Sequence, residues 1–136
     1  MTQNWTRTLA PDFTALHEMA QTAIAGLPEA YRAAARDVAL RIEDFAPDTL
    51  LQQMEVEDAF DLTGLYQGIP LTEKSISDQP YSPDTIWLFR RPILDEWAAR
   101  GDVALAALVT HVLVHELAHH FGWTDDQIAR IDRWWE

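Results

Sequence analysis

Cysteine is absent from the 136 residues of this sequence. Without thiols the chain has no disulfide framework, no thiolate zinc site, no iron–sulfur cluster and no cysteine nucleophile. Any metal site must therefore use histidine, carboxylate or backbone oxygen. Basic residues are also few, with ten Lys and Arg against 22 Asp and Glu and a formal net charge of -12. Because so acidic a chain repels phosphate backbones and anionic lipid headgroups, we expect no nucleic-acid partner and no membrane association.

Long apolar segments are missing as well. The longest apolar-rich stretch, Val103 to Val114, is interrupted by Thr110 and His111 and is too short to span a bilayer. The N-terminal residues contain no continuous apolar core of a signal peptide, so we expect a cytoplasmic protein. Hydrophobic residues at 48% and charged residues at 24% form an ordinary globular mixture. The length then predicts one domain over residues 1–136, with no indication of oligomeric state.

The apolar periodicity and the helix breakers predict helices, then scattered strands, then helices. Helices are expected over residues 12–25, 28–35, 47–54, 93–99, 103–121 and 125–135, and strands over residues 38–43 and 85–91. Gly68 and Pro70 divide residues 65–71 into a short strand, a turn and a second short strand, and residues 75–83 are expected to form a polar loop. Asp102 is expected to cap the long helix and Gly122 to end it. This order favours an α+β fold in which the long helix packs on a small, mainly antiparallel sheet.

The long helix carries its polar residues in an otherwise apolar environment. Every other side chain between Val103 and Phe121 is Val, Leu, Ala or Phe, and the polar ones are Thr110, His111, His115, Glu116, His119 and His120. A helix that is apolar nearly all round belongs in a core. Imidazoles and a carboxylate buried there need partners, because leaving them unpaired is costly. This conflict between local pattern and burial indicates a functional site.

Residues 115–119 read HELAH and match the pattern HExxH. Four residues turn a helix by about 400°, so His115 and His119 lie one turn apart on nearly the same face. Two imidazoles so placed can share one zinc ion. Glu116 lies about 100° round the helix from His115, where its carboxylate can reach a zinc-bound water as general base without binding the metal. Without a metal, the two histidines would be hydrogen-bonded core residues and Glu116 an incidental charge.

A third metal ligand is expected beyond the helix. Gly122 follows His119 by three residues and Asp125 follows Gly122 by three, which extends the pattern to HExxHxxGxxD. A straight helix cannot return its tenth residue to the face of its fourth, whereas a glycine with positive φ allows the chain to turn back. Asp125 is therefore the expected third ligand, with Asp126 as an alternative and an N-cap as its competing role.

Two histidines and one carboxylate are typical of a catalytic zinc site that keeps an open position. We expect one Zn²⁺, although iron and manganese also accept this ligand set. His111 lies one turn before His115. It is expected to hold a metal ligand in place or to lie in the core, with direct binding of the metal as a further alternative. His120 is expected to bond a backbone or carboxylate group, and His17 to lie on the surface.

The run HELAHHFGWTDD resembles the small zincin-like minimal metalloprotease family of bacterial proteins, which carries HExxHHFG before an acidic pair. Residues 64–73 are similar to the GLYxGxPLTE segment of that family, and residues 89–93 are similar to its YRRPI, so the resemblance covers roughly residues 28–128. It implies a compact α+β fold, with His115, His119 and Asp125 binding metal and Glu116 acting as general base. The spacing is also similar to that of metzincins, but all three methionines of this sequence precede the site, whereas metzincins carry a methionine turn after the third ligand.

These observations predict a zinc-dependent metallohydrolase, of peptidase type, that acts on a peptide or protein substrate. Zinc would acidify its bound water and polarise the scissile carbonyl, and Glu116 would transfer the proton. The strand at residues 85–91 is expected to offer an edge for an extended substrate, and Tyr66 is expected near the oxyanion. The alternative is a metal-binding adaptor or regulatory module that retains the zincin site without turnover. Metal-dependent RNA processing is disfavoured by the net charge of -12.

Overall fold

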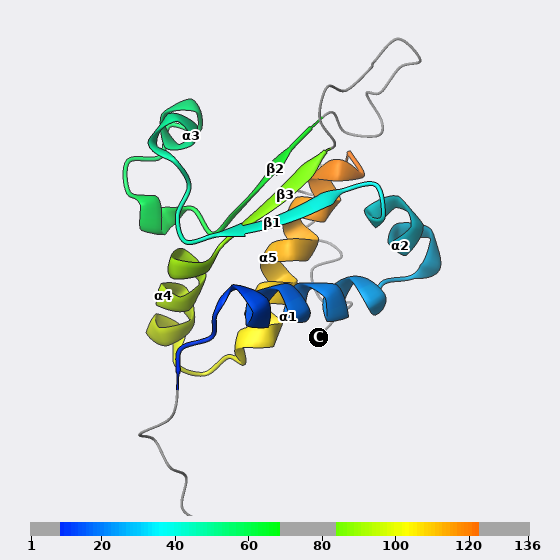
Figure 1. Ribbon diagram of the computed structural model, residues 1–136, viewed down its shortest axis with the longest axis horizontal. Helices are drawn as coiled ribbons and strands as arrows, with labels where there is room; N and C mark the ends of the chain where they lie inside the picture. The colour runs from blue at the N-terminus through cyan, green and yellow to red at the C-terminus, as the bar shows by residue number, and fades with distance from the viewer. Residues whose placement is uncertain (1–8, 69–83, 123–136) are drawn as a thin grey trace, which may run out of the picture.

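The computed structural model describes residues 9–68 and 84–122 (Figure 1). The elements follow the order α1 (Phe13–Ala25), α2 (Glu29–Ala35), β1 (Ala39–Glu43), α3 (Asp48–Gln53), the short 3₁₀-helix η2 (Ala59–Asp61), β2 (Gly64–Gln67), β3 (Thr85–Phe89), α4 (Arg90–Arg100) and α5 (Leu105–His120). This mixture of helices and a small sheet confirms the α+β class. Within the two described ranges, every helix is too short or too polar to cross a membrane.

The described sheet has three strands in the order β1-β3-β2. β1 runs parallel to β3, with Ala39 opposite Thr85, and β2 runs antiparallel to β3, with Gly64 opposite Leu88. The sheet is therefore evenly mixed rather than mainly antiparallel. A parallel pair requires a long crossover, which the segment with α3, η2 and β2 provides. Because β3 is paired on both sides, the expectation that residues 85–91 offer a free edge is wrong.

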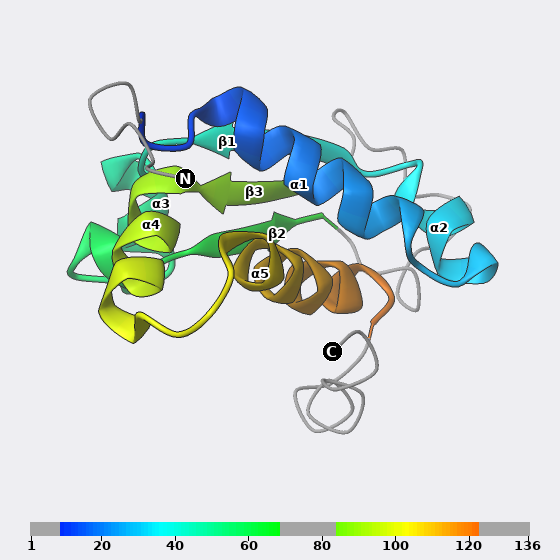
Figure 2. The ribbon, with the colours of Figure 1, turned by 90° about the horizontal axis from the view of Figure 1, so that it is seen from below.

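The two faces of the sheet pack against different elements. Ile86 and Leu88 of β3 are buried in the main core on the face covered by α1 and α5. Figure 2 shows these two helices side by side over that face, α1 nearer β1 and α5 nearer β2. Trp87 and Phe89 alternate to the opposite face, where a second core forms with Leu50 and other residues around α3. Period-two alternation thus places α5 directly against the sheet.

The predicted strand at residues 85–91 ends at Phe89, and α4 begins at Arg90. Pro92 lies in the first turn of α4, where a helix loses no hydrogen bond to a proline. Arg90 anchors this junction, because its Nε donates to the carbonyl oxygen of Pro11 at 2.6 Å and its Nη1 lies 3.0 Å from Oδ1 of Asp44. Pro92 therefore lies inside the first turn of a helix that follows the strand directly, and it does not mark the end of the strand.

The long helix α5 begins two residues later than expected. Ala104 is its N-cap and provides no side-chain hydrogen bond, so the predicted cap at Asp102 is wrong. Gly101 ends α4 with a φ of 73°, and the indole Nε1 of Trp97 donates to the carbonyl oxygen of Val103 at 2.9 Å. These contacts keep the connecting residues outside α5. The helix predicted at residues 125–135 and the strand and loop predicted between residues 69 and 83 lie outside the described residues.

Candidate metal centre

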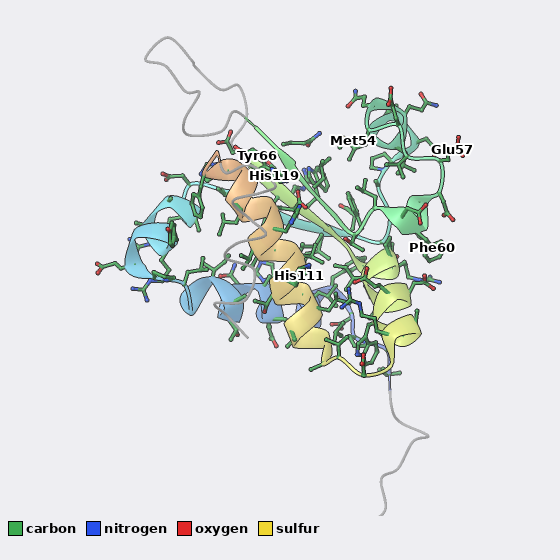
Figure 3. The ribbon with its side chains drawn as sticks, turned by 180° about the vertical axis from the view of Figure 1, so that it is seen from behind. Met54, Glu57, Phe60, Tyr66, His111 and His119 are labelled. Carbon is green, nitrogen blue, oxygen red and sulfur yellow. The ribbon has the colours of Figure 1, made fainter. Side chains whose placement is uncertain are left out.

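All polar residues of α5 except His120 lie on the partly exposed side of a mostly buried helix. Its buried residues are Leu105, Leu108, Val109, Val112, Leu113, Val114, Leu117, Ala118 and His120. His111, His115 and His119 recur every four residues and are each partly exposed. Figure 3 labels His111 and His119 along this helix. Helical spacing thus places three imidazoles on successive turns of one accessible face.

The rings of His115 and His119 are spaced as two ligands of one ion would be. Their centroids are 5.1 Å apart and their planes are inclined by 79°. With a zinc–nitrogen bond of about 2.0–2.1 Å, each ring centroid lies about 3.2 Å from the ion, and a tetrahedral angle then separates the centroids by about 5.2 Å. Neutral imidazole is also a donor that suits zinc. The described donors therefore fit a zinc ion in spacing and in chemistry.

Glu116 is positioned by the close approach of α5 to β2. A Cβ added to Gly64 would lie 2.7 Å from Cγ1 of Val112, 3.1 Å from the carbonyl oxygen of Trp87 and 3.4 Å from Cγ of Glu116. The missing side chain at Gly64 leaves room for the helix and sets Glu116 beside the strand. The strand was expected to begin at Leu65, and Gly64 was noted only as part of the segment similar to GLYxGxPLTE. A glycine in a strand does, however, often mark a close approach of another segment.

Tyr66, Asp84 and His120 meet at the C-terminal end of α5. The Tyr66 hydroxyl lies 3.1 Å from Oδ2 of Asp84 and 3.0 Å from Nδ1 of His120, and this Nδ1 lies 3.3 Å from Oδ2 of Asp84. Asp84 is 6% exposed and His120 is 1% exposed. The expectation that His120 bonds a backbone or carboxylate group is confirmed, and the group is the carboxylate of Asp84. Asp84 was not expected, since nothing in its local sequence indicates a buried carboxylate.

The proton positions in this cluster follow from the donors available. Burial raises the pKa of Tyr66 above its usual value of 10.0, and the nearby negative charge of Asp84 and the hydrogen bond to it raise that pKa further. Tyr66 is therefore neutral and donates its single proton to Asp84. Its oxygen can then only accept from His120, so Nδ1 of His120 carries a proton. With its hydroxyl engaged in this way, Tyr66 is not supported as an oxyanion donor.

His111 lies one turn before His115 and lines a pocket of about 350 Å³. The other lining residues are Arg100, Val103, Ala106, Ala107, Leu108 and Thr110. Among the described residues, no group of three His, Asp or Glu side chains could hold a metal ion. Asp125 and Asp126, the predicted third ligand and its alternative, lie outside those residues. The surface position expected for His17 is confirmed.

A comparison with protein families shows the family of the chain. Residues 35–135 match the profile of the zincin-like metallopeptidase family. The chain belongs to this family. The matched region of this zincin-like metallopeptidase includes the three described strands and the whole of α5. The match confirms the family resemblance indicated by HELAHHFG. Members of the family generally bind zinc. No curated protein matches the chain significantly.

Proposed function

We propose that this protein is a zinc-dependent peptidase in which His115, His119 and Asp125 hold one zinc ion and Glu116 is the general base. The 5.1 Å spacing of the two imidazole rings carries the proposal, because it fits two ligands of a single tetrahedral ion. The third ligand rests on the spacing HExxHxxGxxD, with Asp126 as the alternative. Membership of a metallopeptidase family supports hydrolysis of peptide bonds over other hydrolytic reactions.

Zinc bound at this site would supply a Lewis acid that acidifies water and polarises the scissile carbonyl. Glu116 takes a proton from the attacking water and delivers it to the leaving nitrogen. Its place on the same turn as His115 keeps the base at a fixed distance from the ligand. Its Cγ also lies beside Gly64 of β2, only 3.4 Å from the place that a Cβ would take there, which restricts the side chain further. Such positioning lowers the barrier because little orientational freedom is left to lose in the reaction.

An extended substrate would pair with β2. Among the described strands, β2 lies at an edge of the sheet and is the strand that contacts α5 most extensively. A peptide added to an edge strand gains main-chain hydrogen bonds that do not depend on its sequence. Because Glu116 lies beside Gly64 at the start of β2, a peptide bond held on this edge would lie near the general base.

Glu116→Gln tests the catalytic role. The variant should bind one zinc ion per chain as the wild type does, whereas the rate of peptide hydrolysis should fall by about 10²–10⁴-fold because the proton acceptor is lost. Zinc content is measured by mass spectrometry of metal-replete protein, and hydrolysis is measured on a broad peptide library. His115→Ala is the matched control and should lose zinc as well as activity.

Three outcomes separate the hypotheses. A wild type that binds no zinc under replete conditions contradicts the metal centre. Full activity in Glu116→Gln contradicts the general base. A wild type that binds zinc but cleaves no peptide supports the metal-binding adaptor instead.

A further inference from the structure

Asp84 directly precedes β3 and lies beside the start of β1, the end of β2 and the C-terminal end of α5. Its carboxylate contacts Tyr66 of β2 and His120 of α5. Its backbone carbonyl accepts a hydrogen bond of 2.8 Å from the amide of Ala39 at the start of β1. A Cβ at Gly68 would collide with the Asp84 carboxylate and would approach the Tyr66 hydroxyl to 2.8 Å. Asp84 therefore connects β2 and the C-terminal end of α5 through its buried carboxylate, and it connects β1 through its backbone carbonyl.

These contacts should be strong, because the carboxylate is almost fully removed from water. Hydrogen bonds to an ionised acceptor are stronger than those between neutral groups, and a buried carboxylate that loses one of its donors is costly. The last turn of α5 is fixed by this interaction at His120. Aromatic packing follows immediately, with the rings of Tyr31 and Phe121 5.0 Å apart. The end of α5 is therefore held by side chains of the sheet and of α2.

We propose that Tyr66, Asp84 and His120 form a positioning cluster that fixes the last turn of α5 and thereby places His119 for metal binding. His119 directly precedes His120 on that turn, so a rotation of the turn that moves one imidazole moves the other. Metal sites tolerate displacements of only about 0.5 Å in their ligands before affinity falls. This inference rests on the proposed function, since it assigns the cluster to the same metal centre.

Removing one contact of the cluster should weaken zinc binding without removing a ligand. Tyr66→Phe keeps the ring and deletes the hydroxyl that contacts both partners. His120→Ala deletes the imidazole, whereas His120→Asn retains an N–H near the position of Nδ1. We expect Tyr66→Phe and His120→Ala to raise the zinc dissociation constant by about 10–100-fold, as outer partners of metal ligands do. His120→Asn should recover most of this loss. Competition with a chromophoric zinc chelator measures the constants.

A control breaks a charged contact at the opposite end of β1 and β3. Asp44→Asn weakens the pair with Arg90, whose atoms are 3.0 Å apart and which lies at the start of α4 rather than at the end of α5. Because the Asp44 side chain is 48% exposed, the melting temperature of this variant should fall less than in the cluster variants. Its zinc dissociation constant should stay within about twofold of the wild type, because distant sites act independently.

A second measurement separates ligand geometry from stability. Cobalt in place of zinc has visible absorption bands that depend on the arrangement of its ligands. The bands should change in Tyr66→Phe and His120→Ala and should remain as in the wild type in Asp44→Asn. If Tyr66→Phe does not fold, His120→Ala is compared with His120→Asn instead. The zinc dissociation constants and the cobalt bands of these two variants then test the positioning role.

Affinities equal to that of the wild type in the cluster variants would overturn the positioning role, as would an equal loss of affinity in Asp44→Asn. A wild type that binds no zinc contradicts the proposed function itself. Zinc binding by the wild type therefore distinguishes the two failures: without it the metal centre is wrong, and with it only the positioning role is in question.

Discussion

The Tyr66 hydroxyl donates to Asp84 and accepts from His120, so one oxygen serves two buried partners. Ionisation of Tyr66 would place two negative charges in contact and would remove the donor that the carboxylate uses. Burial disfavours the phenolate further. These effects, with burial the largest, explain why the pKa of Tyr66 is raised in the folded protein.

The raised pKa of Tyr66 predicts a loss of stability at alkaline pH. In the unfolded chain the phenol ionises near its usual pKa of 10.0, whereas in the folded protein it stays protonated at that pH. The unfolded state therefore binds fewer protons, and the free energy of unfolding falls as the pH rises above about 10. Denaturant unfolding from pH 8 to pH 11 should show a decline that is reduced in Tyr66→Phe. Tyr31→Phe keeps the Tyr66 phenol and should decline as the wild type does; equal declines in all three proteins would refute the prediction.

At the scale of elements, the features that depend on local sequence were predicted, whereas those that depend on contacts between distant segments were not. The three- and four-residue apolar spacing located α1, and the aromatic and β-branched run located β3, because both patterns lie within one segment. The parallel pairing of β1 with β3 was not predicted, since it depends on a crossover rather than on either strand. The helical start at Arg90 was missed because Pro92 suits a strand end and a helix start equally well.

The same distinction applies to the candidate site. Helical spacing alone puts His115 and His119 one turn apart with Glu116 between them in sequence, so the sequence was sufficient there. Tyr66 and His120 are 54 residues apart in the chain, and only the packing of β2 against α5 brings them together. The close approach at Gly64 likewise depends on Val112 and on the backbone of Trp87, which no local pattern connects with it.

Gly64→Ala should separate α5 from the sheet. The added methyl group would lie 2.7 Å from Cγ1 of Val112 and 3.1 Å from a backbone oxygen that cannot easily move. We expect a loss of about 1–3 kcal/mol in the free energy of unfolding, as for other overpacked sites. Gly26→Ala is the control, because its nearest contacts would be 3.6 Å and 3.7 Å away at a φ of -84°. Urea unfolding measures both variants, and a Gly64→Ala protein as stable as Gly26→Ala would contradict the close approach.

At the scale of the whole molecule, α5, which carries the proposed metal ligands, is the centre of the packing. α5 contacts α1, α4, β2 and β3, so a ligand on its accessible face acts on most of the described core. An ion that binds only the folded state stabilises the entire domain through mass action rather than through any single contact. The metal centre should therefore affect global unfolding and not only the end of one helix.

Zinc should raise the melting temperature of the wild type. At a free concentration 100 times the dissociation constant, one site adds about 2.7 kcal/mol to the free energy of unfolding. His119→Ala should abolish this gain, and chelation should reverse it in the wild type. His17→Ala removes an exposed histidine of α1 and should keep the full gain. Calorimetry with and without zinc measures the effect, and an equal gain in His119→Ala would place the ion elsewhere.

The order of the described strands has a consequence for biosynthesis. β3 lies between β1 and β2 in space but follows both in the chain. While a nascent chain still lacks Thr85–Phe89, its first two strands have no partner between them, and the described three-stranded sheet cannot form on the ribosome. Pairings between such distant segments also form slowly. The sheet can form only after β3 has been synthesised. Because α5 is the last of these elements in the chain, it packs against the sheet after β3 is present.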